Sequence, residues 1–295
     1  MTRRGRPALA LDLLGVIGVV GLAVTVWLGL WVTPPDRFMG NLVRLLYIHP
    51  PVAWVMYIAY GLSFLASVLY LWPRTRDLRF DRLAGSSAEV GVVFTGLTLV
   101  SGSIWGRPTW GTWWTWDPLL TTTALLFVLY LGYLALRRVP GEPATRARRS
   151  AIGALVAFLD LPIVYFSVDW WRSLHQAPTV TVGRTYVHGS MAWTLLLGFV
   201  SMTALFFWLV GHRYRLAALV DAEEDLALSA AVAERRAEVS DYLPDGGVPH
   251  PADGEPVAVA VGVGAGTAAD APGTGSRSPA VAAGGEAGLA GTRQR

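Results

Sequence analysis

The sequence predicts an all-α, polytopic membrane protein with six transmembrane helices. Of its 295 residues, 53% are hydrophobic and only 15% are charged, whereas about 25% of the residues in an average soluble domain are charged. Apolar runs of about 20 residues, the length that crosses about 30 Å of hydrocarbon, recur between charged or Pro/Gly-rich breaks. The expected spans are 9–32, 47–71, 86–104, 119–137, 151–168 and 188–211.

The first span has the basic start of a signal peptide, since Arg3, Arg4 and Arg6 precede its apolar run. The run is too long for a signal peptide, and "LWVTPP" at its end is a poor small-residue cleavage site. We therefore expect this segment to remain as a transmembrane helix.

The distribution of arginine predicts the orientation, because the chain contains no lysine. On one side of the spans lie three arginines before the first span, four in 74–82, five in 137–149, and Arg213 with Arg215. The opposite loops hold only Arg37, Arg44, Arg107, Arg172 and Arg184. The positive-inside rule places both termini in the cytoplasm of a plasma (inner) membrane protein, and the loops 33–46, 105–118 and 169–187 outside. Because these arginines flank apolar spans, no nucleic-acid partner is expected.

The composition divides the chain into three parts. Residues 1–215 hold the six spans. Residues 216–240 have helical spacing of Leu, Ala and Val with acids early and arginines late, which predicts a cytoplasmic amphipathic helix. Residues 241–295 are mostly Pro, Gly, Ala and Val with scattered charge, and we expect a disordered tail.

The segment "SIWGRPTWGTWWTWDP", residues 103–118, gathers a group of indoles into one expected outer loop. They are Trp105, Trp110, Trp113, Trp114 and Trp116. Indole favours sites that are apolar at one end and wet at the other, so the cluster is either part of an aromatic belt at the lipid headgroups or a surface for a flat ligand. Interspersed glycine and proline predict an irregular loop or a short interfacial helix.

The expected topology separates five histidines by side. His49, His175 and His188 fall outside with the tryptophans, whereas His212 and His250 are cytoplasmic. Paired imidazoles are typical axial ligands of haem iron, because the porphyrin supplies the other four ligands. Zinc would require further protein ligands, for which the outer loops offer His188 or Asp117, and stays an alternative. Since cysteine is absent, thiolate sites are excluded.

Three segments resemble one known family. "WGRPTWGTWWTWDP" is similar to the tryptophan-rich WWD signature of the haem-handling cytochrome c assembly proteins (CcmC, CcmF and CcsA), and most closely to the heme exporter protein C (CcmC) branch. The likeness includes "YIHPP" around His49 and "LPIVYFSVDWWRSLHQ" before and around His175, and it covers about residues 9–212. Leu119 stands where the CcmC pattern commonly has arginine, which puts any contact of that arginine in doubt.

The resemblance implies a delivery protein and no enzyme. It implies non-covalent haem b at the outer membrane face, with His49 and His175 as iron ligands and the tryptophan loop against the macrocycle. The implied partners are a CcmE-like haem chaperone, a small CcmD-like membrane protein and the CcmA–CcmB ABC transporter, besides membrane lipid. A CcsA-like haem-handling protein or cytochrome c synthetase subunit is the nearest alternative.

Other charged residues acquire candidate roles beside a haem. Arg107 and Arg184 are the outer cations best placed to pair with propionates. Asp117 either hydrogen-bonds an indole or imidazole N–H, or caps the helix that starts at Pro118. Asp160 lies in the middle of the fifth span, where a carboxylate belongs either to a helix contact or to the haem route.

A second function class is a b-type membrane electron-transfer protein. Such a protein would place histidine pairs inside its helices, so that haems sit across the bilayer. No histidine falls within the interior of an expected span. A permease is also disfavoured, because neither inverted repeats nor paired broken helices are evident.

Overall fold

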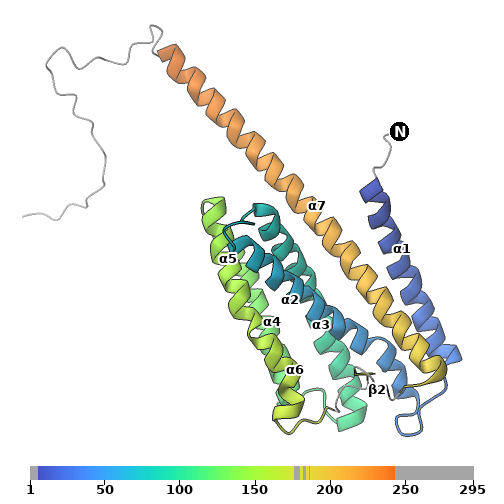
Figure 1. The fold of residues 1–295 in the computed structure, drawn as a ribbon. Coiled ribbons are helices and arrows are strands. Elements are labelled where there is room, and N and C mark those ends of the chain that lie inside the picture. The colour runs from blue at the N-terminus through green and yellow to red at the C-terminus, as the bar shows by residue number, and fades with distance from the viewer. Residues whose placement is uncertain (1–5, 176–179, 182–183, 186, 243–295) are drawn as a thin grey trace, which may run out of the picture. The chain divides into compact units, whose positions relative to one another are not determined.

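The computed structural model describes residues 6–175, 180–181, 184–185 and 187–242. Among these residues, six helical segments are long and apolar enough to cross a membrane, so the all-α class and the six spans are confirmed (Figure 1). The expected disordered tail lies, apart from its first two residues, outside the described residues. The chain is thus a multi-pass membrane protein.

Helices form nearly all of the regular structure. In chain order the elements are α1 (Arg6–Trp27), the π-helix η1 (Leu28–Val32), the 3-10 helix η2 (Asn41–Tyr47), α2 (His49–Leu71), α3 (Leu78–Trp110), α4 (Pro118–Arg137), α5 (Pro143–Phe158), α6 (Asp160–Trp170), β1 (Val180–Thr181), β2 (Arg184–Thr185) and α7 (Gly189–Tyr242). The two short strands pair antiparallel between α6 and α7.

The third helix is longer than expected, which changes the shape of the tryptophan segment. α3 continues past the expected end at residue 104 to Trp110, with Pro108 inside its last turn. It ends where Gly111 adopts a left-handed conformation, φ 80°, and returns its N–H to the carbonyl of Arg107 at 3.0 Å. Glycine adopts this conformation without a steric penalty. Only residues 111–117 therefore form an irregular loop.

The fifth span is broken into two helices. α5 ends at Phe158, and α6 begins at Asp160. Pro162 explains the break, because a proline ring has no N–H to donate and clashes with the carbonyl four residues earlier, here that of Phe158. The Asp160 side chain at the break is buried, and its Oδ2 atom has no hydrogen-bond partner within the described part of the chain.

The sixth span and the expected amphipathic helix form one continuous element. α7 runs from Gly189 to Tyr242, because no proline or glycine lies between Gly211 and Tyr242. Most of the helix from residue 221 to residue 239 is exposed. The separate helix predicted at 216–240 is thus an extension of the last span.

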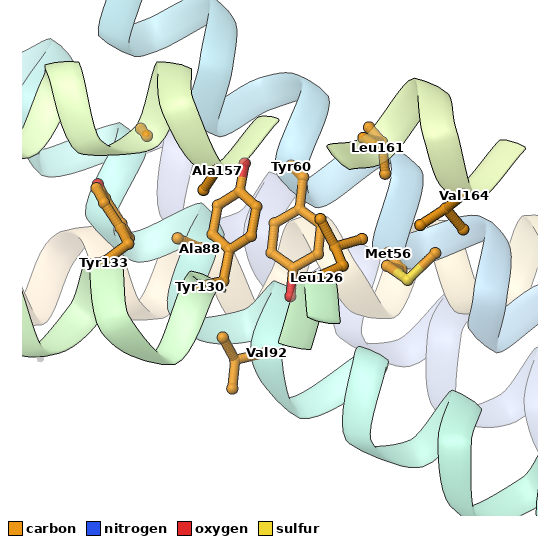
Figure 2. Close-up of a cluster of buried hydrophobic side chains, with 11 residues drawn as sticks. Met56, Tyr60, Ala88, Val92, Leu126, Tyr130, Tyr133, Ala157, Leu161 and Val164 are labelled. Carbon is orange, nitrogen blue, oxygen red and sulfur yellow. The ribbon is translucent and has the colours of Figure 1, made fainter. Parts of the chain in front are cut away.

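The core between α2, α3, α4, α5 and α6 is built around aromatic rings (Figure 2). The rings of Tyr60 and Tyr130 stack with their centroids 3.6 Å apart, and Tyr133 meets Tyr130 edge-on at 5.9 Å. The Tyr60 hydroxyl lies 2.7 Å from the hydroxyl of Thr95 and is hydrogen-bonded to it. Stacked and edge-on pairs add about 0.5–1.5 kcal/mol each beyond their burial, so this cluster joins the central helices.

α7 packs on α2 and α3 through a second apolar cluster that includes Val55, Phe94 and Phe206. α1 then approaches α7 closely at small residues. A Cβ atom on Gly18 would lie 2.8 Å from the backbone nitrogen of Leu205, so only glycine permits this approach.

Chain direction alternates, so functional elements gather at one end of the bundle. The first residues of α2 and α4 and the last residues of α3 and α6 lie at the same end, which we call the tryptophan end (Figure 1). The opposite, arginine-rich end holds the start of α3 and the end of α4. There a bidentate pair between Arg137 and Asp81 joins these two helices.

Candidate functional site

The extended end of α3 brings the two candidate histidines together. Trp105 meets the His49 ring edge-on, with the centroids 5.7 Å apart, and Trp110 meets the His175 ring in the same way at 4.7 Å. The two indoles lie five residues apart on α3, so both imidazoles lie against the last turns of this helix. Residues far apart in the sequence thus contribute two imidazoles to one site at the tryptophan end.

His49 begins α2 and is oriented by a serine of α3. Its Nδ1 lies 2.9 Å from the Ser101 hydroxyl, and that hydroxyl donates its proton to the carbonyl of Leu97 at 2.7 Å. Because a hydroxyl has one proton, Ser101 accepts the hydrogen bond from Nδ1–H of His49. The Nε2 atom of His49 therefore keeps its lone pair. Gly102 leaves room for the ring, since a Cβ there would lie 3.1 Å from His49 Cε1.

His175 lies in the segment after α6 and is oriented by a buried carboxylate. Its Nδ1 lies 3.2 Å from Oδ1 of Asp117, whose side chain is 2% exposed. The carboxylate also accepts hydrogen bonds from the Ser173 hydroxyl at 2.9 Å, the Leu174 N–H at 2.6 Å and the Leu119 N–H at 3.0 Å. Asp117 thus both caps α4 and holds the segment that presents His175, so both expected contacts of this carboxylate occur together.

The same contacts set the charge state of this pair. Burial raises the pKa of Asp117, but the hydrogen bonds from Leu174 and Ser173, the proximity of His175 and the bond from Leu119 outweigh it, and the pKa lies below its usual range. Burial lowers the pKa of His175, and the opposing effect of Asp117 does not cancel this shift. At neutral pH Asp117 is therefore ionised and His175 is neutral, with Nδ1–H donated and the Nε2 lone pair available.

The five tryptophans fall into two groups. Trp105 and Trp110 are partly buried against the histidines, and the indole Nε1–H of Trp105 is buried without a hydrogen-bond partner in the described residues. In the loop, Trp113 is 59% exposed and Trp116 is 83% exposed. Trp114 meets Trp116 edge-on, with the centroids 5.8 Å apart. The site thus combines a buried unsatisfied donor with apolar surface open to the surroundings.

Two imidazoles suffice as protein ligands only for a metal whose other ligands come from a cofactor, such as the four porphyrin nitrogens of haem. Within the described residues, no three His, Cys, Asp or Glu side chains are placed to hold a metal ion. The zinc alternative, with His188 or Asp117 as a further ligand, therefore has no support there, and Asp117 is used by backbone and hydroxyl donors. Two neutral imidazoles beside indoles match the needs of a haem.

Comparison with known proteins identifies the family. The family model for heme exporter protein C matches residues 7–228. The chain belongs to the heme exporter protein C family. Heme exporter protein C of Haemophilus influenzae is 37% identical over 206 residues, 69% of this chain and 82% of that protein.

Two further relatives support the same family assignment. Heme exporter protein C of Bradyrhizobium diazoefficiens is 40% identical over 175 residues, 59% of this chain and 65% of that protein. A putative cytochrome c biosynthesis ccmC-like mitochondrial protein of Marchantia polymorpha is 36% identical over 189 residues, 64% of this chain and 78% of that protein. The family resemblance expected from the tryptophan segment is confirmed.

The two candidate propionate-binding arginines differ in what the structure describes. Arg107 is exposed, and its Nη1 donates to the carbonyl of Gly111 at 2.6 Å, which ties the side chain to the end of α3. Within the described part of the chain its other N–H groups have no partner, so they can meet a ligand. Arg184 lies in β2, but its side chain lies outside the described residues.

Ser101 and Ser173 are site residues that no pattern in the sequence indicated. Ser101 lies four residues before Trp105 on α3, so both residues share the helix face that meets His49. The expected span ended at residue 104, so Trp105 was assigned to a loop and its position one helical turn after Ser101 was not evident. Leu119, in place of the family's common arginine, packs on the aromatic core cluster, while its backbone N–H binds Asp117.

Proposed function

We propose that this protein handles haem for cytochrome c biogenesis by holding haem b non-covalently between His49 and His175. The observation that carries the proposal is that both imidazoles have the same hydrogen-bonding arrangement. Each directs Nδ1–H to a protein acceptor and keeps Nε2 free, and both lie against the end of α3. The names of the family and its relatives, which concern haem export and cytochrome c biosynthesis, support it.

The surroundings of the histidines fit a porphyrin that is held but remains accessible. The Nε1–H of Trp105, which has no partner among the described residues, supplies a donor at the edge of the site. The exposed indoles of Trp113 and Trp116 offer apolar surface for the macrocycle or for a protein that receives it. Arg107 and Arg184 are the candidate partners for the propionates, as charge-assisted pairs.

The role follows from this openness, since a ligand that must leave again cannot be fully enclosed. The protein presents haem to a CcmE-like chaperone, together with a small CcmD-like protein and the CcmA–CcmB ABC transporter, and it performs no bond-making catalysis of its own. The tryptophan end faces outward from a plasma (inner) membrane, and both termini lie in the cytoplasm. The excess of arginine at the opposite end supports this orientation.

The absorption spectrum of the purified protein tests haem binding. We expect a Soret band from the wild-type protein that is lost in the double variant His49→Ala and His175→Ala. The matched control is His212→Ala, because His212 also meets a tryptophan edge-on, Trp208, but near the arginine-rich end. A Soret band that survives the double substitution would exclude this ligand pair.

Single cysteines test the sidedness, and the absence of native cysteine makes every label specific. An impermeant thiol reagent added to intact cells is expected to modify a cysteine at Thr112, in the loop after α3, and not one at Thr145, near the start of α5. After the membrane is opened, both positions should react. Labelling of Thr145→Cys alone in intact cells would reverse the orientation.

A further inference from the structure

The two candidate iron ligands have chemically different hydrogen-bond acceptors. His175 donates Nδ1–H to a carboxylate, Asp117, which three further donors hold in place. His49 donates Nδ1–H to a neutral hydroxyl, that of Ser101, which is itself bound to a carbonyl of its own helix. The site therefore has one charged and one neutral acceptor behind its two rings.

This difference changes how strongly each ring binds iron. A carboxylate that accepts Nδ1–H draws the proton toward itself and makes Nε2 a stronger electron donor to a metal. Hydrogen bonds with an ionised partner are about twice as strong as neutral ones. A hydroxyl has no net charge, so it orients the ring without raising its basicity to the same extent. An iron held by both rings would therefore be bound more strongly by His175.

The packing around the two rings adds to the difference. The Asp117 carboxylate joins the start of α4 to Ser173 and Leu174, so the segment carrying His175 is held at several points. Among the described residues, the side chain of His49 has one hydrogen bond, to Ser101, besides its contact with Trp105. Within this part of the chain each ring thus has one side-chain hydrogen bond and one indole contact, but the acceptor of His175 is itself fixed by three further donors.

We propose that His175 is the retained ligand and His49 the exchangeable one, with Ser101 as the positioning residue that keeps the His49 bond weak. The inference rests on the proposed function. Haem would leave by opening on the His49 side, where an incoming ligand of the receiving protein can replace an imidazole. The neutral acceptor at Ser101 thus serves release, and the charged acceptor at Asp117 serves retention.

Carbon monoxide is a suitable probe, because it binds ferrous haem by replacing one axial ligand. After photolysis of the carbonyl complex of the full-length protein, resonance Raman spectroscopy reports the iron–histidine stretch of the ligand that stayed. That stretch rises in frequency with the basicity of the histidine. We expect Asp117→Asn to lower the frequency and Ser101→Ala to leave it unchanged. The opposite pattern would overturn the assignment.

Single ligand variants provide a second measurement that does not depend on Asp117. The haem retained through gel filtration is expected to be about tenfold higher in His49→Ala than in His175→Ala, as for loss of a weaker compared with a stronger ligand. Equal retention, or more haem in His175→Ala, would overturn the inference while leaving haem binding itself intact. A wild-type protein without a Soret band would instead overturn the proposed function, and this inference with it.

Discussion

Replacing Asp117 with alanine is expected to lower haem affinity by about 10- to 100-fold, the usual effect of removing a carboxylate behind a metal-binding histidine. In the wild-type protein this side chain is 2% exposed and lies 3.2 Å from His175 Nδ1. Alanine would leave the donors of Ser173, Leu174 and Leu119 unpaired and would free the imidazole to rotate. Haem titration of the purified variant, followed at the Soret band, measures the change.

The matched control for this prediction is Asp36→Ala. Asp36 is also a loop carboxylate that accepts two backbone N–H bonds, from Phe38 and Met39, each at 2.8 Å. No hydrogen bond joins it to either histidine in the described residues. We expect the haem affinity of Asp36→Ala to stay within about twofold of that of the wild-type protein, since surface changes away from a site have small effects. Equal losses in both variants would show that Asp117 acts only by ordering a loop.

The Asp117 variant should still fold, which keeps its haem titration interpretable. Loss of a helix N-cap costs about 1 kcal/mol, and the donors of Ser173 and Leu174 left unpaired add about 1–3 kcal/mol each. The six spans keep their helical backbone, because hydrocarbon leaves an apolar run no other way to satisfy its polar groups. The circular dichroism spectrum of Asp117→Ala is therefore expected to match that of the wild-type protein. A collapsed helical signal would assign the loss of haem to unfolding instead.

The six spans follow from the sequence because hydrocarbon leaves the backbone few options. A chain segment that crosses it must satisfy its polar groups internally, and a single apolar run can do so only as a helix. The length and position of the apolar runs therefore predicted the number of spans. Helix ends depend on local contacts instead. The glycines and prolines of 105–118 predict an irregular loop, whereas α3 continues through Pro108 to Trp110.

The histidine pair was predictable, but the groups that orient it were predictable only in part. Charge counting assigned His49, His175 and His188 to one side, and the family resemblance selected His49 and His175 from these three. The structure brings both against α3. Asp117 stood out as a carboxylate beside the tryptophans. Ser101 did not, because a serine in an apolar helix gives no sign of which neighbour it will face. Its role depends on the crossing of α2 and α3, which is a property of packing and not of composition.

The largest effect on stability is expected at the opposite end of the bundle, from Arg137→Met. The guanidinium donates to Asp81 at 2.6 and 2.9 Å and to the Tyr133 hydroxyl at 3.2 Å. The side chains of Arg137 and Asp81 are only 19% and 8% exposed. The close fit extends to Gly85, where a Cβ would lie 2.7 Å from the guanidinium carbon. Methionine would leave the carboxylate buried without its partner.

Breaking a buried ion pair from one side costs about 3–5 kcal/mol, and we expect this loss in the free energy of unfolding of Arg137→Met, measured by denaturant titration in detergent. The control is Arg79→Met, which breaks the exposed pair with Asp77, whose side chains are 65% and 47% exposed. Such surface pairs contribute about 0–1 kcal/mol.

The double variant Asp81→Leu and Arg137→Met removes both charges and should recover most of the loss, because an apolar pair of similar volume is often as stable as the ion pair it replaces. If Arg137→Met were no worse than Arg79→Met, the pair would not join α3 to α4. If the double variant recovered nothing, the cost would come from lost packing around Tyr133 and not from an unpaired charge.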